Sequence, residues 1–162
     1  MKVAIDIDNT IVDYRELIIH YLANNQYEFQ KKFKLRSDFS INVIKNSIKS
    51  NLGDNVWQKI QSLIYSSTEK IGFYDNVEIA FEEIGKLGHE IYLVSHKSKY
   101  PYLGPKYDLH AAAMRWLEKN DFFSVNGLGM SKDQVFFELT KEAKINRVKI
   151  LGCTHYIDDL PE

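Results

Sequence analysis

Hydrophobic residues in this chain follow two patterns, short continuous runs and longer stretches with helical spacing. Four short runs, at residues 2–8, 90–95, 134–137 and 154–158, are rich in β-branched and aromatic residues. Continuous apolar runs are typical of parallel strands that are buried on both faces of a sheet. Between the runs, residues 76–87, 108–119 and 141–151 repeat their apolar positions at helical intervals. This alternation predicts an α/β fold with a doubly wound parallel sheet.

The stretch from residue 14 to residue 74 breaks the alternation. Its apolar residues recur at helical intervals, as Ile41, Ile44 and Ile48 do, and it contains no convincing strand. A stretch of about 60 residues is far longer than an ordinary connecting loop. We therefore predict a helical insertion at 14–74 and an α/β core made of residues 1–13 and 75–162.

Composition and charge exclude several other classes of protein. The hydrophobic content of 44% and charged content of 27% are those of a globular chain rather than a disordered one. The formal net charge of −1 provides no field that would attract nucleic acid or an anionic membrane. The single cysteine, Cys153, cannot form an intrachain disulfide, which fits a reducing compartment. Because we see neither a signal peptide nor a membrane-spanning run, we expect a cytoplasmic protein.

Two carboxylates stand at the end of the first predicted strand. Asp6 and Asp8 follow the apolar residues Val3, Ala4 and Ile5. Open α/β sheets bind their ligands at the carboxyl ends of their strands, and alternation along the strand places both carboxylates on one side. Like charges this close need a metal ion, or one of them must bind a proton. A simple capping turn into a helix is the alternative for this segment.

The segment Asp6-Ile7-Asp8-Asn9-Thr10 resembles the first motif of the haloacid dehalogenase-like (HAD) hydrolase superfamily. Three further motifs of that superfamily have counterparts in the same order: Ser95 closes the second strand, a lysine begins the helix at 141–151, and Asp158-Asp159 follow the fourth strand. The resemblance covers the chain outside the inserted helices. It implies a Rossmannoid core with strand order 3-2-1-4 and an inserted helical cap.

The resemblance also implies a mechanism. Asp6 is similar to the superfamily's nucleophile, which forms an aspartyl phosphate, and Asp8 to its general acid and base. The implied cofactor is Mg²⁺, a hard ion that prefers oxygen ligands. Its ligands would be Asp6, the backbone carbonyl of Asp8 and the acidic pair of the fourth motif. Within that pair Asp159 is the preferred ligand, and Asp158 would orient a metal-bound water.

Phosphate binding is expected from residues of the second and third motifs. Ser95 can donate its hydroxyl to a phosphate oxygen. Lys141 and Lys144 both lie near the start of their helix, and the spacing to the acidic pair resembles that of Lys144 better, with Lys141 as the alternative. His96 and Lys97 begin a loop beside the site. They either contact the phosphate or the leaving group, or are solvated loop residues.

The sequence thus predicts a Mg²⁺-dependent phosphatase that acts on a small phosphorylated substrate, with neither a nucleic acid polymer nor a membrane as partner. A phosphoryl transferase or mutase of the same superfamily is one alternative. A non-catalytic module that binds a phosphate ligand is another, because fold does not imply function. Its best support is that the chain ends directly after the fourth strand, which would leave that strand without its covering helix. The identity of the phosphomonoester and the oligomeric state stay open.

Overall fold

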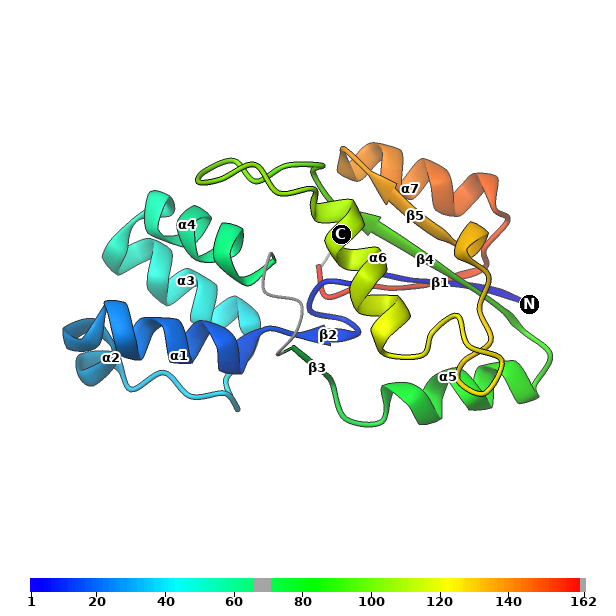
Figure 1. Cartoon of the computed structure of the whole chain (residues 1–162), viewed down its shortest axis with the longest axis horizontal. Helices are drawn as coiled ribbons and strands as arrows, with labels where there is room; N and C mark the ends of the chain where they lie inside the picture. The colour runs from blue at the N-terminus through cyan, green and yellow to red at the C-terminus, as the bar shows by residue number, and fades with distance from the viewer. Residues whose placement is uncertain (66–70, 161–162) are drawn as a thin grey trace.

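Four parallel strands form the central sheet of the computed structural model, which describes residues 1–65 and 71–160 (Figure 1). The strands are β1 (Lys2–Ile5), β4 (Glu90–His96), β5 (Val135–Glu138) and β6 (His155–Ile157). Their spatial order is β5-β4-β1-β6, with every neighbouring pair parallel. This is the order 3-2-1-4 in sequence terms, so the predicted α/β fold and its topology are confirmed.

Helices cover both faces of this sheet. Alternate residues of a strand point to opposite faces, and β1 shows the consequence. Ile5 joins a large apolar cluster that includes Trp116, whereas Ala4 joins a smaller cluster that includes Val148. Trp116 lies in α6 (Leu109–Lys119) and Val148 in α7 (Lys141–Ile150), so each apolar face of the sheet is covered. This part of the chain also contains α5 (Val77–Lys86) and the 3₁₀ turn η2 (Lys132–Gln134).

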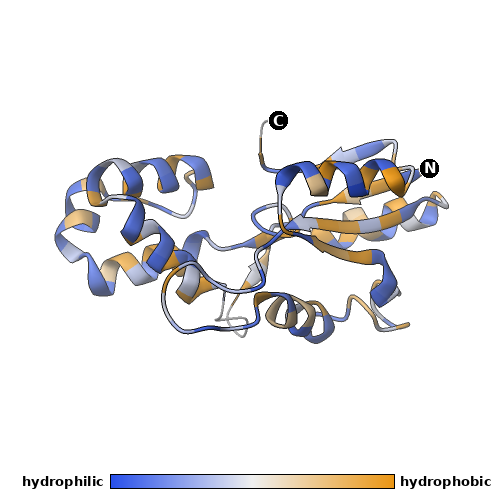
Figure 2. Cartoon of the chain, turned by 90° about the horizontal axis from the view of Figure 1, so that it is seen from above, coloured by the Kyte–Doolittle hydropathy of each residue, from blue (hydrophilic) through white to orange (hydrophobic). Residues whose placement is uncertain are grey.

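Four further helices lie beside the sheet, within the stretch for which an insertion was predicted (Figure 1). They are α1 (Arg15–Asn25), α2 (Tyr27–Phe33), α3 (Ile41–Leu52) and α4 (Asp54–Ile64). The domain boundaries at 13/14 and 74/75 stay predictions, and residues 66–70 lie outside the described part. Figure 2 shows hydrophilic and hydrophobic positions mixed along these helices, as expected for helices that bury one face only.

The expectation that residues 14–74 hold no strand was wrong, because β3 (Gly72–Phe73) lies within this stretch. It pairs antiparallel with β2 (Val12–Asp13), another strand of two residues, so that the pair stands where the chain leaves the core and where it returns. A two-residue strand is too short to show a period of two in the sequence, so its pattern could not reveal it. We call this pair of strands, β2 and β3, the ribbon. It holds the two ends of the helical segment side by side.

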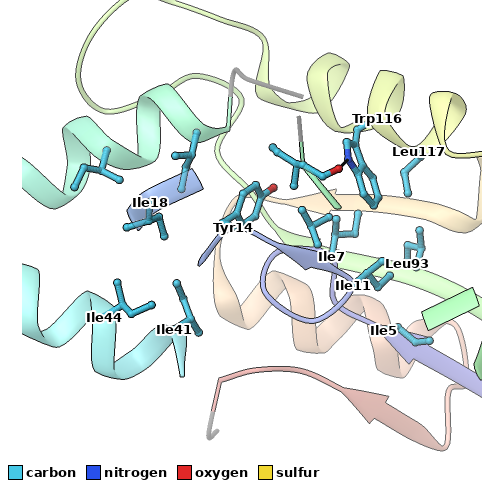
Figure 3. Packing of buried hydrophobic residues seen from close by; sticks show 14 of the residues in the cluster. Ile5, Ile7, Ile11, Tyr14, Ile18, Ile41, Ile44, Leu93, Trp116 and Leu117 are labelled. Atoms are coloured by element: carbon cyan, nitrogen blue, oxygen red, sulfur yellow. Dashed lines mark hydrogen bonds between the residues drawn. The ribbon is translucent and has the colours of Figure 1, made fainter. Parts of the chain in front are cut away.

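The helical segment and the sheet share one apolar core. Ile18 of α1 and Ile44 of α3 are fully buried, and they belong to the same cluster as Ile7 and Trp116 on the sheet side. Figure 3 shows Tyr14 between these two groups of side chains. The indole nitrogen of Trp116 donates to the backbone oxygen of Ile71 at 3.1 Å, beside the returning ribbon. Among the described helices, none has the length and apolar character needed to cross a membrane.

The buried face of α3 gives a test of this packing. Ile44 is fully buried, and its truncation in Ile44→Ala removes apolar contacts and leaves a cavity. We expect the free energy of unfolding to fall by roughly 2–5 kcal/mol, measured by urea denaturation. The matched control Val43→Ala changes an adjacent residue that is 51% exposed, and it should stay within about 0.5 kcal/mol of wild type. Equal losses in the two variants would contradict the described orientation of α3.

Candidate active site

The ends of three adjacent strands bring three of the predicted residues together. Ile5 pairs with Leu93 of β4 on one side and with Ile157 of β6 on the other. The next residues along, Asp6 and Asp158, are therefore level at the carboxyl edge of the sheet. Ser95 lies two positions beyond Leu93 on β4, so it reaches the same edge from the other neighbouring strand. The first, second and fourth motifs thus meet although they are far apart in sequence.

A tight turn after β1 directs the first motif into the site. The amide of Asp6 donates to Ile157 at 2.9 Å, which extends the sheet by one bond beyond the last strand residue. The amides of Ile11 and Val12 then both donate to the carbonyl of Ile7, at 3.1 and 3.0 Å. Asn9 completes the turn with φ of 60°, a left-handed conformation that asparagine tolerates better than most residues.

Buried polar atoms without hydrogen-bond partners gather at this turn and its neighbour strand. In the described part of the chain they include Asp6 Oδ1, Asn9 Oδ1, Thr10 Oγ1 and Ser95 Oγ. Nearly all buried polar atoms in folded proteins are hydrogen-bonded, so an unpartnered group is costly and calls for an explanation. Four such atoms within two motifs are typical of a site that binds a polar ligand.

Three carboxylates lie close together at the sheet edge. Oxygen atoms of Asp6, Asp158 and Asp159 all lie within 4.8 Å of one another. Lys144 partly offsets their charge, because its Nζ donates to Asp158 Oδ2 at 2.6 Å. One ammonium among three carboxylates leaves an excess of negative charge with several oxygen ligands, and this donor set suits a divalent cation such as Mg²⁺. The Asp8 carboxylate is not a member of this cluster.

Burial of these carboxylates alters their ionisation. Loss of solvation, and after it the Asp8 carboxylate, raises the pKa of Asp6 to about 7. Burial and the neighbouring Asp158 carboxylate likewise raise the pKa of Asp159. A bound cation would favour the charged forms and reverse both effects. The site is therefore under electrostatic strain that a metal ion would relieve.

Of the two lysines considered for the third motif, the structure buries Lys144. Its side chain is 0% exposed and reaches the carboxyl edge of the sheet from α7. Thr140 caps the start of that helix by accepting from the Ala143 amide at 3.1 Å, which makes Lys141 the first helical residue. Lys141 is exposed and lines the adjoining cavity. Lys144 stands one turn further in, where the helix packs against the sheet.

The second aspartate of the first motif has its own partners. Asp8 accepts from the Tyr14 hydroxyl at 2.8 Å on one oxygen and from Lys97 Nζ at 2.6 Å on the other. Burial, and after it the nearby Asp8 carboxylate, holds the pKa of Tyr14 well above its ordinary value, so this phenol stays protonated and donates. Lys97 is buried, which corrects the interpretation that it is a solvated loop residue.

A cavity of about 310 Å³ opens between the sheet edge and the helical segment. Asp6, Asp8 and Lys144 line one side of it, and Trp57 and Tyr65 of the helical segment line the other. The loop after β4 supplies a third wall, which includes Pro101 and Tyr102. His96 also lines the cavity, while its Nε2 lies 3.1 Å from the backbone oxygen of Leu139.

Sequence reasoning missed two residues of this environment and left a third open. Tyr14 entered the sequence analysis only as the start of the predicted insertion, and Tyr65 was not singled out at all. No sequence signal could have linked Tyr65 to the first motif, because 57 positions separate it from Asp8 and only the fold brings them near. Lys97 carried a weak signal, since it comes two positions after Ser95, which closes the strand of the second motif.

Fold and site together agree with the arrangement that the resemblance implied. A parallel sheet of order β5-β4-β1-β6 carries Asp6, Ser95 and Asp158 at one edge, and Lys144 reaches that edge from α7. The fold that the resemblance to the HAD-like hydrolase superfamily implied is thereby confirmed. That the helical segment acts as a cap stays a prediction.

Comparison with known proteins adds relatives of low identity. The chain is 27% identical over 165 residues to a "Putative nucleotidase" from Bacillus cereus, a match that covers 99% of this chain and 77% of the relative. It is 24% identical over 170 residues to "Putative nucleotidase OB0422" from Oceanobacillus iheyensis, which covers 99% and 78%. A crystal structure of a haloacid dehalogenase-like family hydrolase from Xanthomonas campestris aligns over 94% of this chain and 69% of its own, with a TM-score of 0.49 and 10% identity. No family model matches the sequence.

The raised pKa of Asp6 predicts how the metal-free protein responds to pH. Its folded-state pKa of about 7 lies above the ordinary 3.8, so the folded state holds this proton more tightly than the unfolded state does. The contribution of Asp6 is therefore most favourable below pH 4 and is lost as pH rises to about 7. At about 1.4 kcal/mol per pH unit, the loss amounts to roughly 4 kcal/mol.

The measurement compares wild type with Asp6→Asn by urea unfolding in chelator, because the amide does not titrate and other groups cancel in the difference. We expect the amide variant to gain stability relative to wild type as pH rises from about 4 to about 7. Added Mg²⁺ should reduce that gain at pH 8 by stabilising wild type selectively. A difference that is independent of pH and Mg²⁺ would contradict the described environment of Asp6.

Proposed function

We propose that this chain is a cytoplasmic, Mg²⁺-dependent phosphatase that hydrolyses a small phosphomonoester through an aspartyl phosphate on Asp6. The observation that carries the proposal is the gathering of unpartnered buried atoms on Asp6 and Ser95 beside an acidic cluster and a buried lysine. A phosphate ester needs this combination, because its anionic oxygens repel a nucleophile until charge is neutralised and the reacting atoms are aligned.

The proposed reaction has two steps. In the first, an oxygen of Asp6 bonds to phosphorus while the bond from phosphorus to the ester oxygen breaks, and Asp8 gives that oxygen a proton so that it leaves as an alcohol. In the second, water attacks phosphorus and loses a proton to Asp8, which releases inorganic phosphate from Asp6. Ser95 and Lys144 would bind the phosphate oxygens throughout.

The metal would be held by Asp6 and Asp159, together with the backbone carbonyl of Asp8. We favour Asp159 over Asp158, because Lys144 already donates to one Asp158 oxygen and the amide of Leu160 to the other, at 3.3 Å. When bound, Mg²⁺ supplies positive charge that offsets the repulsion between the nucleophile and the phosphate.

A nucleoside monophosphate is the substrate class that we favour. Both relatives described above carry the name nucleotidase. The lining of the cavity also includes the aromatic side chains of Trp57 and Tyr102 and the amide side chains of Gln58 and Gln61. Rings that can stack and amides that can hydrogen-bond suit a planar base. We further propose that the helical segment is a cap that excludes water from the reaction.

The proposal is tested with a panel of nucleoside 5′-monophosphates, sugar phosphates and glycerol phosphate, by release of inorganic phosphate. We expect turnover with Mg²⁺, none in excess chelator, and none in Asp6→Asn, because an amide cannot act as the nucleophile. Rapid acid quenching should trap a phosphorylated protein from wild type and not from Asp6→Asn. Asp38→Asn, a change at an exposed aspartate of the helical segment, should behave like wild type. Full activity in chelator, or in Asp6→Asn, would refute the mechanism.

A second test decides between the two lysines. If Lys144 binds the phosphate, Lys144→Met should lower kcat/KM by ~10²-fold or more, because a preorganised charge at the phosphate is lost. Lys149→Met alters an exposed lysine of the same helix and should leave kcat/KM near wild type. Loss of activity in Lys141→Met but not in Lys144→Met would transfer the role to Lys141.

A further inference from the structure

The Asp8 carboxylate is held on both of its oxygens. Tyr14 donates to Oδ1 at 2.8 Å, and Lys97 donates to Oδ2 at 2.6 Å. A carboxyl group offers about four lone-pair positions, so these two bonds fix its orientation and leave positions at which it can carry the proton that passes to the leaving oxygen. Asp8 also lines the cavity, which gives the remaining positions access to a bound ester.

The ammonium group of Lys97 contacts Asp8 and is shielded from solvent. Its side chain is 4% exposed, and a buried ammonium is costly unless a partner compensates it. It forms an ion pair with Asp8, and its Nζ also lies 4.3 Å from the centre of the Tyr65 ring. An ammonium over an aromatic face gains a cation–π attraction that grows when the pair is desolvated. Lys97 is therefore held from two directions with its donor turned to the carboxylate.

Tyr65 also contacts the other partner of Asp8. The rings of Tyr14 and Tyr65 meet edge to face, with centroids 5.0 Å apart. Tyr14 comes from the start of the helical segment, and Tyr65 directly follows α4 at its other end. Figure 3 shows Tyr14 between the side chains of the helical segment and those of the sheet. Residues from both ends of the helical segment therefore contribute to the surroundings of Asp8.

We propose that Lys97 and Tyr14 are positioning residues that aim the Asp8 carboxyl group at the leaving oxygen, and that Tyr65 holds both in place. The inference rests on the proposed function, in which Asp8 exchanges the proton. It assigns different tasks to the two lysines that are buried in the described part of the chain: Lys144, paired with Asp158 beside Asp6, serves the phosphate, whereas Lys97 serves the acid and base.

The assignment predicts a dependence on the leaving group. An ester of an aliphatic alcohol needs a proton on its leaving oxygen, whereas p-nitrophenolate departs readily without one. Lys97→Met keeps an unbranched apolar stem of similar size and removes the ammonium. We expect it to lower kcat/KM for the nucleoside monophosphate that wild type hydrolyses fastest by ~10²-fold, and kcat/KM for p-nitrophenyl phosphate by less than about fivefold. KM should change little for either substrate.

Two further variants keep the test decisive. Tyr14→Phe removes one hydroxyl, so it should show the same selectivity with a loss of about tenfold, even if Lys97→Met fails to fold. Lys97→Arg retains the positive charge and should recover part of the lost activity. The matched control Lys99→Met changes an exposed lysine of the same loop and should resemble wild type on both substrates. Melting temperatures of all variants separate a loss of fold from a loss of positioning.

Three results would overturn the inference. Equal losses on both substrates in folded Lys97→Met and Tyr14→Phe would show that these residues bind the phosphate instead. No loss on either substrate would show that they have no part in turnover. If wild type hydrolyses neither ester, the proposed function fails and the inference fails with it, whereas the first two results leave the phosphatase function intact.

Discussion

Negative charge buried at one edge of the sheet is the constraint on which the rest of this structure depends. Asp6, Asp158 and Asp159 meet there because parallel strands end together, and Lys144 is the buried cation that pairs with them. In a protein interior such a cluster is costly, and the raised pKa of Asp6 is the direct expression of that cost. The apolar packing on both faces of the sheet has to compensate for it, and a cation can relieve it.

The same edge shows how two carboxylates two positions apart acquire different surroundings. Asp6 has an oxygen without a hydrogen-bond partner among the described residues, while both oxygens of Asp8 are occupied by Tyr14 and Lys97. The unpartnered oxygen of Asp6 can accept a hydrogen bond from a ligand or bind a cation, whereas the two hydrogen bonds to Asp8 fix the orientation of its carboxyl group. Position on the strand brings both residues to the site, and the side chains around each of them make their surroundings different.

The helical segment contributes to the site through its packing as well as its walls. Its buried isoleucines belong to the same apolar cluster as the residues under the sheet, so the two parts are one packed body. Tyr14 and Tyr65 stand at its two ends, in contact with each other and with the partners of Asp8. A change in how these helices pack on the core would therefore shift the surroundings of the Asp8 carboxyl group, because protein interiors transmit small shifts through close packing.

The sequence by itself determined the α/β alternation and the carboxylates at the ends of the first and fourth strands, because buried parallel strands and their terminal carboxylates leave local patterns that need no knowledge of the fold. The strand order was expected only from the resemblance to a known superfamily. The sequence favoured Lys144 over Lys141 without excluding the latter, since one helical turn separates them and only the packing of α7 decides which is buried. The two-residue strands of the ribbon were too short to leave a pattern. Only the tertiary structure decided that Tyr65 lies at the site and that Lys97 is buried. A lysine in a loop is expected to be solvated, and here the fold packs the Asp8 carboxylate and the Tyr65 ring against its ammonium group.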